Sequence, residues 1–136
     1  MKRQSEELFF KYISSASQQG NNCVIFHMPD EYEPLQGDII EMIISEPDTY
    51  GGATYYAKII LYKDGDDIYT AALDGRLKGN DGSIYTLYTA SYNINAGNKL
   101  LYLFANDNAN IAFNEQGNLV NMIVHRPKAG IELYVA

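Results

Sequence analysis

The sequence predicts a mainly β protein, an antiparallel β-sandwich or barrel of eight or nine short strands with one N-terminal α-helix. Two observations predict it. Short apolar stretches recur from about residue 22 onward and are separated by Gly, Asn, Asp and Pro at near-regular intervals. Within several of them, apolar side chains alternate with the period of two that is typical of strands. The 136 residues fit a single domain, residues 1–136.

Residues 4–18 are predicted to form the helix. Ser5 is followed by two glutamates, as at a capped helix N-terminus, and Phe9 and Ile13 recur at helical spacing. Gly20 stands where a helix would end. Such a helix would be either a lid on the sheet or a docking arm.

Residues 34–45 leave two folds open. Their isoleucines recur at helical spacing, which would give an α+β fold with one curved antiparallel sheet and two helices on a face. Gly37 and the many β-branched residues favour a strand instead, and we predict a strand.

The remaining strands follow from alternation and turn residues. Tyr55, Ala57, Ile59 and Leu61 should face the core, and Asp64-Gly65 predicts a hairpin turn. Residues 74–83 are predicted to be a loop. The predicted strands are 23–28, 54–62, 68–73, 84–92, 99–105, 109–113, 119–125 and 131–135.

Charge and tyrosine content point to protein recognition. The net charge is −7, and Lys and Arg occur singly or in short pairs, which argues against nucleic-acid binding. Seven acids lie between residues 28 and 57 without one Lys or Arg, so this segment is either a solvated face or a patch for a basic partner. Twelve tyrosines and no tryptophan suggest half-buried strand faces, some of them contact surfaces.

Catalytic and cofactor motifs are absent. Cys23, His27 and His125 lack the spacing of a zinc site or a nucleophile with its base, and no phosphate loop is present, so we expect no cofactor. A lone cysteine allows no internal disulfide and fits a reducing compartment. The apolar runs are too short for a signal peptide or a membrane span. We therefore expect a cytoplasmic protein, or part of a particle assembled in the cytoplasm, with no membrane partner.

These observations favour a non-enzymatic protein-interaction module. It would be either a small inhibitor or immunity-type protein, or an accessory or structural component of a larger assembly such as a phage particle, and homo-oligomers stay open. The alternatives are a glycan-binding β-sandwich using Tyr rings with loop Asn and Asp, and a small enzyme with a carboxylate-based site. The candidate partner-binding residues are acids of the 30–48 segment and outward tyrosines: Asp30, Glu31, Glu33, Asp38, Glu46, Asp48, Tyr56, Tyr62 and Tyr88.

Overall fold

Antiparallel strands make up nearly all the regular structure of the chain. The computed structural model describes residues 5–45, 55–65, 67–95, 98–111 and 117–127, in which there are ten strands and no helix. The strands are β1 (Ser5–Ser14), β2 (Ala16–Gln19), β3 (Cys23–His27), β4 (Ile39–Ser45), β5 (Tyr55–Asp64), β6 (Asp67–Lys78), β7 (Ile84–Thr86), β8 (Thr89–Asn95), β9 (Asn98–Phe104) and β10 (Asn118–Pro127).

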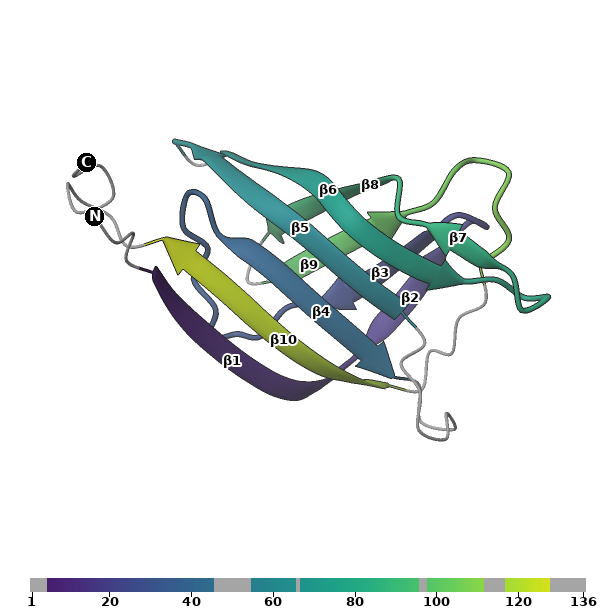
Figure 1. Cartoon of the computed structure of the whole chain (residues 1–136), viewed down its shortest axis with the longest axis horizontal. Helices are drawn as coiled ribbons and strands as arrows, with labels where there is room; N and C mark the ends of the chain where they lie inside the picture. The colour runs from purple at the N-terminus through teal and green to yellow at the C-terminus, as the bar shows by residue number, and fades with distance from the viewer. Residues whose placement is uncertain (1–4, 46–54, 66, 96–97, 112–116, 128–136) are drawn as a thin grey trace.

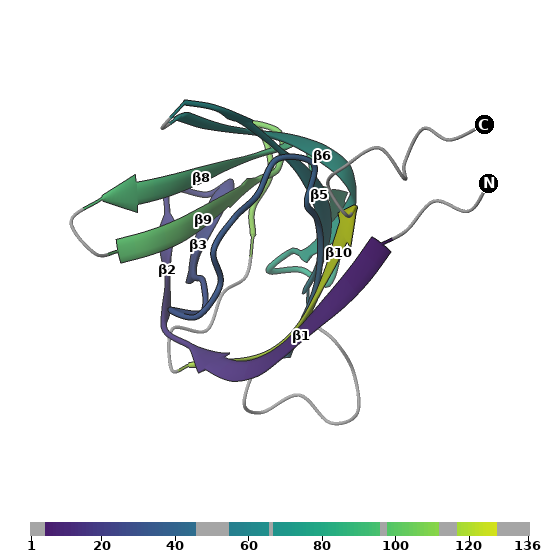
Figure 2. The same ribbon diagram turned by 90° about the vertical axis from the view of Figure 1, so that its left-hand side faces the viewer.

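The strands form two sheets that face each other across the core. The larger sheet has six strands in the order β1-β10-β4-β5-β6-β7, and the smaller has four in the order β2-β3-β9-β8. All neighbouring strands are antiparallel. Figure 1 shows the six-stranded sheet in front of the other, and Figure 2 shows the space that the two enclose.

The chain passes from one sheet to the other at both edges. At one edge β1 runs almost directly into β2, and the backbone N–H of His27 donates to the carbonyl of Ser15 at 3.3 Å. At the other edge the N–H of Leu87 donates to Gly75 of the large sheet, and the N–H of Tyr88 donates to Phe104 of the small sheet. The two sheets are therefore joined along both sides, as in a flattened barrel.

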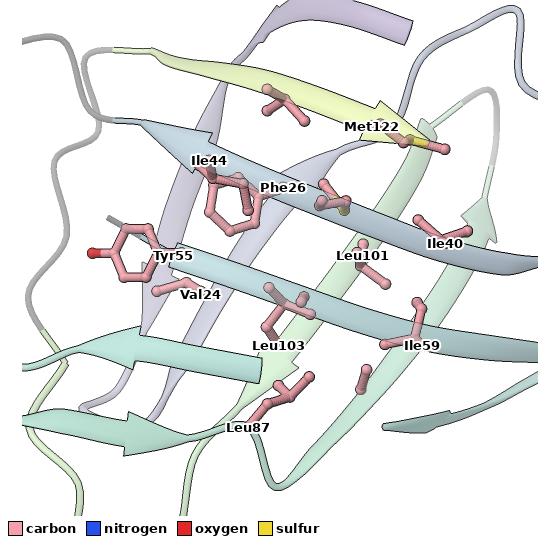
Figure 3. Close-up of a cluster of buried hydrophobic side chains, with 14 of the residues drawn as sticks. Val24, Phe26, Ile40, Ile44, Tyr55, Ile59, Leu87, Leu101, Leu103 and Met122 are labelled. Carbon is pink, nitrogen blue, oxygen red and sulfur yellow. The ribbon is translucent and has the colours of Figure 1, made fainter. Parts of the chain in front are cut away.

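The core lies between the two sheets and is built by alternation. The small sheet contributes Val24, Phe26, Leu101 and Leu103, and the large sheet contributes residues such as Ile40, Ile44, Ile59 and Met122, all at most 1% exposed (Figure 3). The Phe26 ring meets the Tyr55 ring edge-on, with centroids 6.3 Å apart. Each large buried side chain contributes about 1.5–3 kcal/mol to folding, so this core supplies most of the stability.

The predicted N-terminal helix is wrong. Residues 5–14 form β1, in which Leu8, Phe10 and Tyr12 pack against the core while Phe9 and Ile13 point outward. Apolar residues on both faces hide the alternation, and they mimic a helical stripe at i and i+4. Ten consecutive residue pairs with β10 hydrogen-bond one edge of this segment, and the contacts of Leu8, Phe10 and Tyr12 with the core favour the strand over a helix.

Gly20 ends a strand and not a helix. It has φ 63° and lies in the tight turn between β2 and β3, where Gln19 is paired with Cys23. A glycine with positive φ serves a hairpin as well as a helix C-terminus, so the signal was ambiguous.

Several other predictions are confirmed. Residues 39–45 form a strand and not a helix, so the α+β alternative is wrong for that segment. The face that carries Tyr55, Ala57, Ile59 and Leu61 is buried, each residue at most 1% exposed. Gly65 has φ 61° in the turn between β5 and β6.

The first half of the predicted loop 74–83 is strand, because β6 continues to Lys78 after a register shift opposite Lys58 and Ile59. The predicted strand 84–92 is two strands that belong to different sheets. Gly75 allows this crossing, since a Cβ there would lie 2.4 Å from the Cβ of Leu87. Of the predicted strand 109–113, only an isolated bridge between Ile111 and Gly79 is described, and residues 131–135 lie outside the described part.

Candidate functional site

The acidic loop between β3 and β4 closes one end of the barrel. Its Met28, Pro29, Tyr32 and Pro34 are buried, and the Tyr32 ring packs edge-on against Phe10 of β1 at 5.9 Å. Backbone hydrogen bonds tie the loop to both sheets, from the N–H of Met28 to Lys99 of β9 and between residues 37–38 and Leu61 of β5. The loop is therefore held in place on both sides, and its exposed side chains project from a fixed backbone.

Asp38 is a structural anchor within this loop. Its carboxylate is 0% exposed and accepts hydrogen bonds from Arg126 Nε at 2.9 Å and Arg126 Nη2 at 3.0 Å. The Tyr32 hydroxyl donates to it at 2.6 Å and the Leu35 N–H at 3.0 Å. Burial and this bond to Asp38 raise the pKa of Tyr32 far above its usual range. Asp38 thus lies out of reach of a partner, although we predicted it as a contact residue.

Basic residues distant in the sequence neutralise part of the acidic segment. Lys99 Nζ donates to the carbonyls of Asp30 and Tyr32 at 2.9 and 2.8 Å, and it lies 3.4 Å from the Glu33 carboxylate. The Glu33 side chain is 82% exposed, so this pair is weak. Glu33 and Asp38 therefore have basic partners, although residues 28–57 contain no Lys or Arg.

Asp30 and Glu31 keep the character that we predicted for the segment. Both are exposed, and within the described residues no basic side chain lies within ion-pair distance of either carboxylate. They line a groove of about 310 Å³ whose other wall carries Ile13, 68% exposed. His27 lies in this groove with Nδ1 3.0 Å from the Ser15 hydroxyl. The groove therefore combines unpaired negative charge with an exposed apolar side chain.

The predicted tyrosines do not form one surface. Tyr62 is 47% exposed and lies opposite Tyr69, 57% exposed, on the outer face of the large sheet. It adjoins the acidic loop, because residue 61 pairs with residues 37 and 38. Tyr56 lies near the start of β5, where the Arg76 guanidinium carbon stacks over its ring at 4.9 Å from the ring centroid. Tyr88 is 68% exposed at the crossing between the two sheets. Glu46 and Asp48 lie outside the described residues.

A hydrogen-bonded chain on the outer face of the large sheet escaped the sequence analysis. Glu41 Oε1 lies 2.6 Å from His125 Nε2, and Glu41 Oε2 accepts a hydrogen bond from the Tyr56 hydroxyl at 2.9 Å. The hydrogen bond from Tyr56, and after it the contact with His125, lower the pKa of Glu41. Burial, and after it the hydrogen bond to Glu41, raise the pKa of Tyr56 to about 12. Glu7 approaches His125 Nδ1 at 3.9 Å. Only strand register brings these residues together, so spacing in the sequence gave no signal.

The small sheet carries an uncharged hollow of about 530 Å³ that sequence reasoning also missed. Tyr102 and Phe104 lie two residues apart on β9, with ring centroids 6.3 Å apart and planes 12° from parallel. Aromatic residues at i and i+2 of a predicted strand were the available signal. Amide and hydroxyl side chains surround the rings, and the lining residues are Gln19, Gly20, Asn22, Cys23, Ser91, Asn93, Tyr102 and Phe104.

Cysteine and histidine chemistry finds no support in the geometry. Cys23 is 1% exposed, and burial raises the pKa of its thiol to about 11, so the nucleophilic thiolate is scarce at neutral pH. His27 and Cys23 are on the small sheet, whereas His125 is on the large one. Within the described ranges, no three His, Cys, Asp or Glu residues are grouped so that they could hold a metal ion. The described part of the chain also contains no helix with the length and apolar character needed to cross a membrane.

Comparisons with known proteins do not assign the chain to a family. No protein-family model matches the chain, and neither the curated proteins nor the solved structures that were compared with it give a match.

Proposed function

We propose that this chain is a non-enzymatic protein-interaction module that binds a partner with a basic surface at the closed end of the barrel. The observation that carries the proposal is the groove in which Asp30 and Glu31 are exposed, with no ion pair to either carboxylate among the described residues, beside the exposed Ile13. Unpaired carboxylates on a fixed loop create a local negative potential, which speeds the approach of a cationic partner. Ile13 offers apolar contact area beside these carboxylates. Tyr62 and Tyr69 lie near the opposite end of the large sheet's strands, where the register runs from Glu7 through His125 and Ile39 to Ile60.

Association kinetics test this proposal. A partner is first captured with the full chain, and the association rate is then measured at about 50 and 300 mM salt. Replacing Asp30 by Asn and Glu31 by Gln should lower the association rate and weaken its salt dependence, because rim charges act mainly on association. Asp67→Asn is the matched control, since Asp67 is an exposed acid at the start of β6. Equal rates for the wild type and the double variant at low salt would contradict the proposal.

The two kinds of interaction protein differ in solution behaviour. An inhibitor or immunity-type protein should be soluble and monodisperse alone, whereas an accessory or structural subunit of a particle should self-associate or need its neighbours. Size-exclusion chromatography with light scattering at increasing concentration separates them.

A second candidate function, oligosaccharide binding, is favoured by the hollow on the small sheet. Aromatic rings present apolar faces to the C–H surface of a sugar, and amides such as Gln19 and Asn93 can donate to and accept from its hydroxyls. The lining side chains are uncharged, and Asp107 lies 3.5 Å from the Asn22 amide, so the ligand would be neutral.

Titration with neutral hexasaccharides of glucose, xylose, mannose and N-acetylglucosamine tests this second function, followed by tyrosine fluorescence and NMR shifts. We expect shifts confined to the residues that line the hollow, and a loss of at least about tenfold in affinity for Tyr102→Ala. Tyr69→Ala, on the other sheet, is the control. No binding at millimolar concentration, or equal binding by Tyr102→Ala, would rule out this site.

A further inference from the structure

Among the described residues, no strand pairs with the second edge of β1. This strand lies at the end of the six-stranded sheet and pairs with β10 through ten consecutive positions without a register shift. Just beyond its C-terminal end the backbone is bonded, because the His27 N–H donates to the Ser15 carbonyl at 3.3 Å. Over residues 5–11, no strand of the described part pairs with that edge.

An edge of this kind is a template for another strand. Proteins usually protect long regular edges with bulges, prolines or charges, because the free N–H and C=O groups pair readily with a second chain. Residues 5–11 contain neither a bulge nor a proline, and their charged residues are Glu6, Glu7 and Lys11. The outward side chain of Phe9 is 70% exposed, so the edge also offers apolar area. Lys11 is the one basic residue on it, and a partner strand must match this charge.

The outward residues of β1 are complementary to themselves. In an antiparallel pair, directly opposed residues point to the same face of the sheet. When two copies are related by a two-fold axis at Phe9, Glu7 of each copy lies opposite Lys11 of the other. The two Phe9 rings then face each other. On the inward face, Leu8 lies opposite Phe10.

Neighbouring registers lack this match. An axis at Leu8 would place Glu7 opposite Phe9, and an axis at Phe10 would place Phe9 opposite Lys11. Only the Phe9-centred arrangement pairs opposite charges with each other and apolar side chains with each other. Charge complementarity therefore selects both the partner and the register.

We propose that a second copy of this chain pairs with the free edge of β1, antiparallel and about a two-fold axis at Phe9. The large sheets of the two copies then form one continuous sheet. Such an interface is closed and isologous, so it yields a dimer and not a filament. The same register places Glu6 of the second copy opposite Tyr12, which lines the groove with Asp30 and Glu31. This proposal does not depend on the proposed function.

Sedimentation equilibrium of the full chain at low salt, over about 1–200 μM, tests the pairing. The wild type should approach twice its mass of 15.3 kDa. Glu7→Lys alone or Lys11→Glu alone places two like-charge pairs across the axis and should raise the dissociation constant about tenfold or more. The double variant Glu7→Lys/Lys11→Glu reverses both charges and should restore the dimer.

Asp67→Lys makes the same charge change as Glu7→Lys at an exposed position on β6 and should leave the dimer intact. Melting curves of every variant show whether the fold is kept. A wild type that stays monomeric at 200 μM overturns the proposal. So does a dimer that withstands both single reversals, since it would use another surface. Loss of the dimer in both single variants and its return in the double variant supports the pairing.

Discussion

The buried carboxylate of Asp38 should be one of the most sensitive positions for stability. Replacement by Ala removes the acceptor for the Arg126 guanidinium, the Tyr32 hydroxyl and the Leu35 N–H at the same time. These groups join the loop to β10 and hold the closed end of the barrel together. Without Asp38, the donors must find water or stay unpaired in a buried place.

The expected loss of folding free energy depends on how exposed the partners of Asp38 are. Removing one member of a buried ion pair destabilises a protein by about 3–5 kcal/mol, because a charge is left uncompensated. The Arg126 side chain is 15% exposed and can partly reach solvent, so we expect the lower end, about 3 kcal/mol. For a domain of this size, that corresponds to a fall in Tm of about 10 °C. Asp38→Asn keeps the volume and one acceptor oxygen and should cost about 2 kcal/mol.

Urea unfolding followed by circular dichroism at pH 7 measures these free energies. Glu33→Gln is the matched control, because Glu33 lies in the same loop and pairs with Lys99 while 82% exposed. The free energy of unfolding of that variant should fall by at most about 0.5 kcal/mol. A double-mutant cycle with Arg126→Ala should give a coupling energy of at least about 1.5 kcal/mol. If Asp38→Ala loses no more than Glu33→Gln, the reasoning about the anchor is refuted.

Three further predictions concern the pH limits, the thiol and the strand crossing. The lowered pKa of Glu41 contributes stability above its ordinary value of 4.5 that is lost as the pH falls, and Glu41→Gln should flatten this acid limb of a stability–pH curve. The raised pKa of Tyr56 contributes stability below 10.0 that is lost as the pH rises toward about 12, and Tyr56→Phe should remove this alkaline loss. Native Cys23, with its raised pKa of about 11, should react with a disulfide reagent at pH 8 only as fast as the protein opens, and rapid labelling would contradict its burial. Gly75→Ala should lower the free energy of unfolding by about 1–3 kcal/mol, because the new Cβ would lie 2.4 Å from the Cβ of Leu87. A wild-type melting temperature for this variant would contradict the close approach.

Much of the β architecture could be predicted from residues alone. The alternation from Tyr55 to Leu61 identified the buried face of β5, and Asp64-Gly65 identified the hairpin that follows. These signals are local, since the pleat sets side-chain direction and a positive φ sets the turn. The prediction of an N-terminal helix was wrong for an equally local reason. Phe9 and Ile13 are apolar but point away from the core, so the period of two was masked.

The candidate site was only partly visible in the sequence. Asp30 and Glu31 carry the exposed charge that composition suggested. Whether an acid of this segment forms an ion pair depends on residues elsewhere in the chain. Lys99 and Arg126 reach the acidic loop from β9 and β10. A count of charges within thirty residues could not reveal either contact, because ion pairs depend on distance in space.

The sequence by itself determined the strand class, the hairpin turns and the net negative charge. These properties depend on residue types and their spacing along one element. Only the tertiary structure decided which acids are buried, which tyrosines share a surface and which strand edge stays open. Sheet order and register are set by packing the whole core at once, and they bring together residues such as Asp38 and Arg126 that no local pattern connects.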